Sequence, residues 1–472
     1  GEAPAAGAAA DAPADAPASA EGMGGDEADP LAAAAPKPPP RTGRWWQNES
    51  AAAGFAAQLR ANDPSLTSLC LVPPKRFDEP DVEEISAALE GNTFCEELLA
   101  SGHSLSDVSC ERLARVLRVN RSLKTLSLGD SGLGDRAAVL FRGLAENVSL
   151  TSLDLEHKGL PTKVGQALAE ALTQRGGLGA PTLQCLRLSR NPAVADALEA
   201  FAAAPAPAEL LLCEGGLSGA RHAAALGRWA AGGVERLDLR GNSGFGAEGV
   251  ELLLAALVPV AAPPSAPPLR RLVLDGCAVG DDGVEALAEA LERGLALEEL
   301  SLDGCEVTAH GCEFLVRAMH GGRFTRLCLR GNNLEDEGCA AVAGVAESLD
   351  LSSTDVGPGG LSALAKQQGL STLELFNSPR LGHSVGGWCA ALAPTDWLSL
   401  RHLDMSCCGF GNDGFHTICT KLLEQPDIMP RLESLCLGGN DVDDSEEAAS
   451  YALVDALSAK REGRLRLIWR NG

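Results

Sequence analysis

Apolar residues change their spacing within short segments of the chain, and residues 269–294, "LRRLVLDGCAVGDDGVEALAEALERG", show the change. In the first half the apolar residues are Leu269, Leu272 and Leu274. They stand three and then two positions apart, as in a strand that runs into a turn. In the second half the apolar residues recur at three- and four-residue spacings, which predicts a helix with one apolar face. They are Val284, Leu287, Ala288 and Leu291. The segment is therefore predicted to be one strand–turn–helix unit.

The same pattern, LxxLxLxx(N/C)xL followed by a helical stripe, recurs about every 28 residues. Its fourteen units begin at Leu66, Cys95, Leu123, Leu150, Leu183, Pro207, Val234, Leu269, Leu297, Phe324, Ala346, Leu370, Leu400 and Leu432. One unit cannot bury its strand and its helix stripe alone, but stacked units can. Because helices are wider than the spacing between strands, the stack must curve. We expect an α/β solenoid with parallel strands on its concave face and helices on its convex face.

This pattern resembles leucine-rich repeats, and the repeat length with a full helix is similar to that of the ribonuclease-inhibitor type. The best matches begin at Leu123, Leu269 and Phe324. The resemblance implies a horseshoe of about 14 to 15 repeats, with "RLRLIWRNG" at the end of the chain supplying a partial fifteenth strand.

Four regions are predicted along the 472 residues. Residues 1–43 form an Ala- and Pro-rich acidic tail whose composition predicts disorder. Residues 44–65 form a helical cap over the first repeat, with four apolar contact residues: Trp45, Trp46, Phe55 and Leu59. Residues 66–461 are the repeats, and residues 462–472 are a terminal strand or cap. The units that begin at 150, 234, 370 and 400 carry insertions before the next strand, which should lie along one edge, and the unit at 324 should have a shortened helix.

Charge and cysteine usage narrow the function classes. The formal net charge of −25 argues against a general nucleic-acid binder, which needs clustered Lys and Arg. The 15 cysteines include no CxxC pair, which favours a reducing compartment, cytoplasmic or nuclear. No apolar run is long enough to insert into a membrane as a helix.

The sequence contains no motif for catalysis. A GxxxxGK[ST] phosphate loop, an HExxH zinc motif and a GxSxG nucleophile elbow do not occur. We therefore predict no catalytic residue, metal site or cofactor.

The ninth position of the units alternates between Asn and Cys, and a structural role is predicted there. In the repeat type that the pattern resembles, this side chain turns inward and satisfies backbone groups at the bend after the strand. The positions concerned are Asn191, Asn242, Cys277, Cys305, Asn332, Cys408 and Asn440.

The outward strand positions form the predicted concave face, where acidic residues outnumber basic ones. A local group of arginines is interleaved with carboxylates, and one aromatic residue lies nearby: Arg187, Arg236, Asp238, Arg240, Arg271, Arg326, Arg330 and Phe376. One interpretation is a solvated face with internal ion pairs. The other is a protein-docking surface, because Arg binds carboxylates in a bidentate manner. The sequence leaves both open.

The preferred function is a noncatalytic scaffold that binds one or more unidentified partner proteins on the concave face and edge loops. The alternative is a GTPase-activating protein that resembles the Ran GTPase-activating proteins, which share this repeat type. That alternative would make a small GTPase the partner.

Overall fold

The structure is a computed structural model that describes residues 51–258, 268–319, 321–443 and 447–469. The chain divides into two units, residues 1–48 and 49–472, and all described residues belong to the second. The predicted tail, residues 1–43, and Trp45 and Trp46 of the predicted cap lie outside the described residues.

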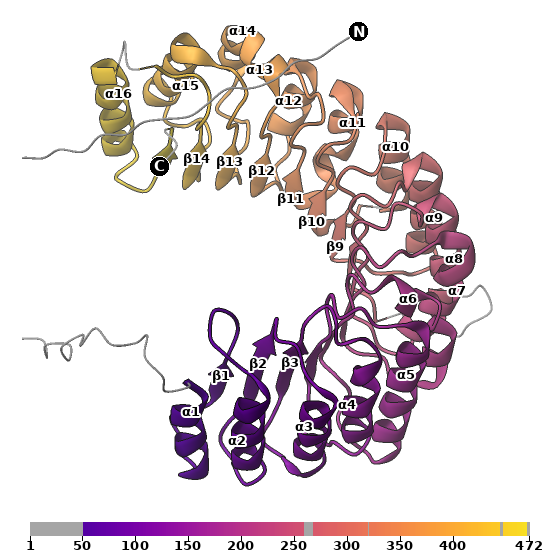
Figure 1. The fold of residues 1–472 in the computed structure, drawn as a ribbon. Coiled ribbons are helices and arrows are strands. Elements are labelled where there is room, and N and C mark those ends of the chain that lie inside the picture. The colour runs from indigo at the N-terminus through magenta and orange to yellow at the C-terminus, as the bar shows by residue number, and fades with distance from the viewer. Residues whose placement is uncertain (1–50, 259–267, 320, 444–446, 470–472) are drawn as a thin grey trace, which may run out of the picture. The chain divides into compact units, whose positions relative to one another are not determined.

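The described strands form one parallel sheet in which every strand pairs with the strands of the preceding and following units. Figure 1 labels β1–β3 and β9–β14, which lie side by side in chain order. The strands are β1 Ser68–Cys70, β2 Glu97–Ser101, β3 Thr125–Gly129, β4 Ser152–Asp154, β5 Cys185–Arg187, β6 Glu209–Leu211, β7 Arg236–Asp238, β8 Arg271–Val273, β9 Glu299–Ser301, β10 Phe324–Cys328, β11 Ala346–Asp350, β12 Thr372–Glu374, β13 His402–Asp404, β14 Ser434–Cys436 and β15 Arg466–Ile468.

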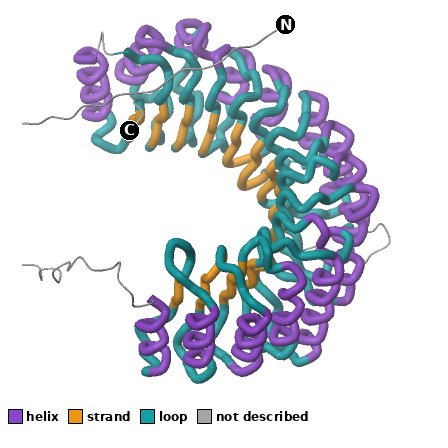
Figure 2. Tube along the Cα trace, viewed as in Figure 1, coloured by secondary structure: helices purple, strands orange, loops and turns teal. Residues whose placement is uncertain are grey.

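Helices follow the strands and form the second layer. Within residues 49–472 the stack is curved, with the strands on its inner side and the helices on its outer side (Figure 2). The helices are α1 Ala51–Arg60, α2 Glu79–Leu89, α3 Asp107–Val119, α4 Ala137–Leu144, α5 Thr162–Gly177, α6 Pro192–Ala195, α7 Gly219–Ala230, α8 Gly246–Leu257, α9 Gly280–Glu292, α10 Ala309–Ala318, α11 Glu335–Ala341, α12 Pro358–Ala365, α13 Pro379–His383, α14 Val385–Ala391, α15 Gly411–Glu424 and α16 Glu447–Lys460. Short 3₁₀ turns lie at Gly134–Arg136, Leu198–Ala203 and Val342–Gly344.

The strand register follows the repeat. The leucine in the fourth position of each unit pairs with the leucine of the next unit, as Leu272 of β8 does with Leu300 of β9. The curved α/β solenoid predicted from the apolar pattern is thereby confirmed, with fifteen strands in the described part of the chain.

The core runs between the two layers without a break. In the unit that begins at Leu269, the strand residues Leu272 and Leu274 and the helix residues Val284 and Leu287 have no exposed surface. Since each unit buries its stripe against its neighbours, the outward strand positions rest on a rigid framework.

Helix α1 lies at the first end of the stack, where Ala52, Ala56 and Leu59 are buried and Phe55 is half-buried. It packs beside α2. In the unit at 324, α11 has only seven residues and is followed by a 3₁₀ turn. The helix of this unit is therefore shorter than α9, which has thirteen residues.

Candidate protein-binding surface

The asparagines of the ninth position are buried beneath the concave strands and hydrogen-bond to the backbone of the turns that follow them. Asn242 is buried; its amide nitrogen donates to the carbonyl oxygens of Leu212 and Leu239, and its amide oxygen accepts from the Leu217 N–H at 3.0 Å. The bonds to Leu212 and Leu217 reach the preceding repeat, whereas the bond to Leu239 stays within the same repeat, so buried backbone groups are satisfied both within and across units. Three further asparagines are buried and make equivalent bonds: Asn191, Asn332 and Asn440.

The cysteines of the same position are buried and donate to backbone. The thiol of Cys277 lies 3.1 Å from the carbonyl oxygen of Leu239, that of Cys305 lies 3.0 Å from Leu274 O, and that of Cys408 lies 3.3 Å from Leu375 O. Burial raises the pKa of Cys277 to about 12 and that of Cys305 to about 11. These thiols stay protonated near neutral pH and belong to the framework rather than to a reactive site.

Asp238 departs from the sequence expectation. It was expected on the exposed concave face, but its side chain is 1% exposed and lies beneath two arginines. Arg240 donates to its carboxylate through Nε at 3.0 Å and Nη2 at 2.7 Å, and Arg236 approaches at 3.8 Å. Burial alone would raise the pKa of Asp238, but hydrogen bonds from Arg240 and the Cys213 thiol outweigh it and leave the pKa lowered. Asp238 is covered and cannot contact a partner directly.

The other predicted arginines divide into paired and unpaired groups. Arg271 is exposed and pairs with Glu299 of the neighbouring strand at 3.3 Å. Arg187 is exposed on β5, and no carboxylate among the described residues lies within ion-pair distance of it. Arg236, Arg240 and Arg271 thus serve mainly to neutralise carboxylates of the same face.

Three of the predicted residues come together on strands β10 and β12. Arg326 Nη2 lies 3.6 Å from Glu374 Oε1, and the Arg330 guanidinium lies 5.7 Å from the centre of the Phe376 ring. Arg326 belongs to β10 and Arg330 to the turn after it, whereas Glu374 belongs to β12 and Phe376 to the turn after that strand. We call these four residues the β10–β12 patch.

The intervening strand makes this arrangement possible. β11 carries the small, half-buried side chain of Ser348 and the buried side chain of Asp350, and Ser352 in the turn after it is also buried. Long side chains from β10 therefore extend across β11 without obstruction. Sequence reasoning did not single out Glu374, because spacing along the chain gives no sign of a contact two strands away.

Carboxylates crowd the neighbourhood of the patch. Asp303 accepts from the Arg330 N–H at 2.9 Å, and burial, followed by the charges of Asp275 and Asp350, raises its pKa to about 6. Burial and the Asp350 charge also raise the pKa of Glu374. Among the described residues, no group of three or more His, Cys, Asp or Glu side chains is arranged so that it could hold a metal ion. The patch therefore combines arginines with carboxylates, and such a set of side chains suits the recognition of charged groups.

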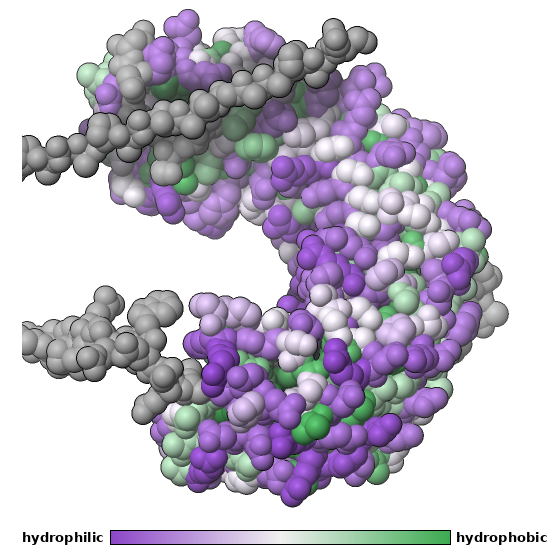
Figure 3. Space-filling model, viewed as in Figure 1, coloured by the Kyte–Doolittle hydropathy of each residue, from purple (hydrophilic) through white to green (hydrophobic). Residues whose placement is uncertain are grey.

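Polar residues also dominate the wider inner wall of the stack around the patch. Figure 3 shows the inner wall in the middle of the stack as mainly hydrophilic. Half-buried Phe376 is an apolar element within this wall. A partner that docks there must satisfy charged groups around one aromatic contact.

A leucine-rich-repeat family model matches five segments of the chain, at residues 119–141, 265–288, 324–343, 347–365 and 398–419. These segments coincide with strand–turn–helix units of the structure. The chain is a leucine-rich-repeat protein. Its assignment to the ribonuclease-inhibitor type stays a prediction.

Solved structures that resemble this leucine-rich-repeat protein include the leucine-rich-repeat-containing protein LegL7 from Legionella pneumophila, at 16% identity and a TM-score of 0.38, with 83% of this chain and 97% of that chain covered. The TLR13–ssRNA13 complex matches at 17% identity and a TM-score of 0.45, over 82% of this chain and 51% of that chain. The actin-binding site 2 of leiomodin-1 matches at 19% identity and a TM-score of 0.25, over 29% of this chain and 79% of that chain.

A comparison with curated proteins finds no match. Within the described ranges, the helices are all too short or too polar to cross a bilayer.

Proposed function

We propose that this protein is a noncatalytic scaffold that binds a partner protein on its concave wall, with the β10–β12 patch as the anchor. One observation carries the proposal: Arg330 has no carboxylate within ion-pair distance among the described residues and covers a half-buried aromatic ring instead. Arginines and aromatic residues are enriched among the residues that contribute most to interface affinity.

The unpaired state of Arg330 distinguishes it from its neighbours. Arg240 forms two hydrogen bonds to buried Asp238, and Arg326 is engaged by Glu374. Arg330 keeps its planar set of N–H donors free of a carboxylate partner, so a partner carboxylate can bind there in a bidentate manner. The Phe376 ring would then provide the apolar part of the contact.

A reducing compartment, cytoplasmic or nuclear, is part of the proposal. All cysteines of the chain lie among the described residues and all are free thiols. Disulfides are rare in such compartments, and a long chain rich in free cysteine is compatible with them.

The proposal is tested by quantitative affinity capture from cell extract with a variant that carries Arg330→Ala and Phe376→Ala. A matched control exists on the outer side: Arg317 covers the ring of Phe314 on α10 at 5.1 Å. The control variant therefore carries Arg317→Ala and Phe314→Ala. Both variants are checked for native unfolding transitions before capture.

Partners that are lost from the concave variant and kept by the outer-side control would support the proposal. Equal retention by both variants, or equal loss from both, would contradict it. Stimulated GTP hydrolysis by a captured Ran-like small GTPase is the result that would favour the GTPase-activating alternative.

A further inference from the structure

The outer layer has a gap between α12 and α14. The helical segment of the unit that begins at Leu370 is divided into α13, with five residues, and α14, with seven. The break falls at Ser384, whose φ of −127° and ψ of 20° are not helical. A Cβ atom on Gly382 would collide with the Cys408 carbonyl oxygen, so α13 lies close against the turn of the following unit.

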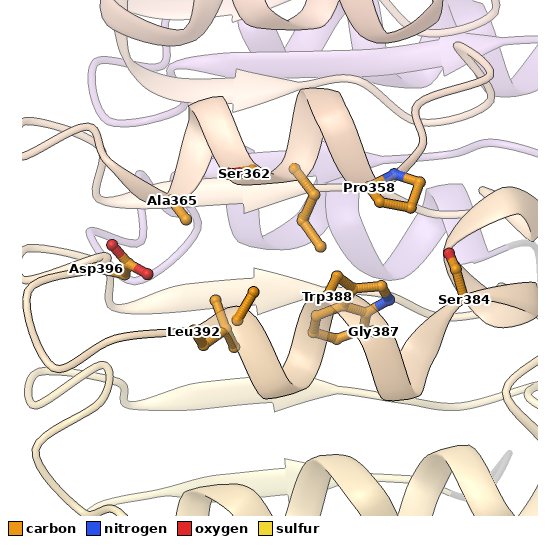
Figure 4. Close-up of a pocket in the computed structure, with 10 residues that line it drawn as sticks. Pro358, Ser362, Ala365, Ser384, Gly387, Trp388, Leu392 and Asp396 are labelled. Atoms are coloured by element: carbon orange, nitrogen blue, oxygen red, sulfur yellow. The ribbon is translucent and has the colours of Figure 1, made fainter.

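The gap forms an apolar groove, shown in Figure 4, that encloses about 250 Å³. Its walls come from Leu361 and Ala365 of α12 and from Trp388, Ala391 and Leu392 at α14. Protein interiors leave few voids larger than a water molecule, and an apolar cavity of about 150 Å³ is enough to bind benzene. The groove therefore has room for one aromatic side chain.

One charged side chain lines the groove. Asp396 is half-buried at the end opposite Pro358 and Ser384 (Figure 4), and its Oδ2 accepts from the Ala393 N–H at 2.9 Å. Among the described residues, no basic side chain pairs with it. A carboxylate at the edge of an apolar groove favours a ligand that joins an apolar group to a cation.

We infer that this groove docks a segment of a partner protein that inserts an aromatic side chain beside Trp388 and places a neighbouring Lys or Arg against Asp396. The commitment to a cation rests on the charge of Asp396, and the commitment to a ring rests on the volume and the apolar walls. This surface belongs to the helix layer, so its occupant and the concave partner can bind independently.

The first test uses 2-phenylethylammonium as a probe of the groove in the full-length protein. Binding is followed by the methyl NMR signals of Leu361 and Leu392. We expect saturable shifts with 2-phenylethylammonium and weaker binding of 3-phenylpropionate, whose charge is repelled by Asp396. Asp396→Asn should weaken the amine by about fivefold and leave the neutral probe 2-phenylethanol unchanged.

Two adjacent glycines supply a matched pair of variants. Gly387 lines the groove and Gly386 does not, and an added Cβ meets nothing within 4 Å at either position. Gly387→Leu should abolish the shifts, whereas Gly386→Leu should keep them. Shifts that persist in Gly387→Leu, or equal affinity for the amine and the carboxylate, would overturn the inference.

The second test separates a polypeptide from a free small ligand. The peptide acetyl-AAFKAA-amide should displace 2-phenylethylammonium, and acetyl-AAFEAA-amide should not. An amine that binds but is displaced by neither peptide would exclude a partner segment as the occupant.

Discussion

The guanidinium of Arg330 lies 5.7 Å from the centre of the Phe376 ring, although the two residues follow strands that are separated by β11. The contact exists because the outward side chains of β11 are small or buried. It places an exposed cation over an aromatic face at the ends of β10 and β12.

Removing this contact should have little effect on stability. Arg330→Met keeps the apolar stem and removes the charge, so the free energy of unfolding should fall by about 0.5 to 1 kcal/mol, the value of an exposed cation–π contact. Urea unfolding measures the change. A loss above about 3 kcal/mol would show that Arg330 supports the framework, and its assignment to a docking surface would then be wrong.

Leu272→Ala tests the core register. Leu272 has no exposed surface, and truncation of a buried leucine should lower the free energy of unfolding by about 2 to 5 kcal/mol. Arg271→Ala, one position away on the exposed side, should cost about 0 to 1 kcal/mol, because it loses only a surface ion pair with Glu299. Equal effects of the two substitutions in urea unfolding would contradict the register.

Asn332→Ala tests the hydrogen bonds that the ninth-position asparagines make to the backbone of the turns. The side chain accepts from the N–H groups of Cys305 and Val307 and donates to the carbonyl oxygen of Leu302 at 2.8 Å. Its loss leaves buried backbone groups unsatisfied, and we expect a cost of about 2 to 4 kcal/mol in the free energy of unfolding. Asn333 is exposed, so Asn333→Ala should change stability by less than about 0.5 kcal/mol. Thermal and urea unfolding of the pair give the comparison.

Asp303 should make stability depend on pH. Burial and the neighbouring carboxylates raise its folded pKa to about 6, above its ordinary value of 3.8. The folded state therefore binds more protons than the unfolded state between these values, so its contribution to stability is present below about pH 4 and is lost as pH rises through about 6. Asp303→Asn keeps an acceptor for the Arg330 N–H without the charge.

The Asp303→Asn variant should be more stable than the natural protein at pH 7.5, by about 1 to 3 kcal/mol, and equally stable at pH 4. Urea unfolding at the two pH values measures the difference. A stability difference that stays constant between pH 4 and 7.5 would show that Asp303 does not carry this titration.

The sequence by itself determined the layers and the register. Apolar spacing in each unit was sufficient, because one unit cannot bury its strand and its helix stripe alone, whereas stacked neighbours can. Leu272 and Leu274 are buried as their spacing requires. The same periodicity placed Arg326, Arg330 and Phe376 on the concave wall.

Tertiary structure decided which outward residues are accessible and which of them meet. Asp238 has the same alternating position as Arg187, yet Arg240 of its own repeat folds over it and buries it. Arg330 reaches Phe376 because the side chains of β11 and its turn, which lie between them, are small or buried. The groove beside Asp396 depends on how a divided helix sits against its neighbours. Periodicity assigns a face to each residue, but the reach of long side chains and the gaps between helices depend on neighbouring repeats, which are adjacent only in the folded stack.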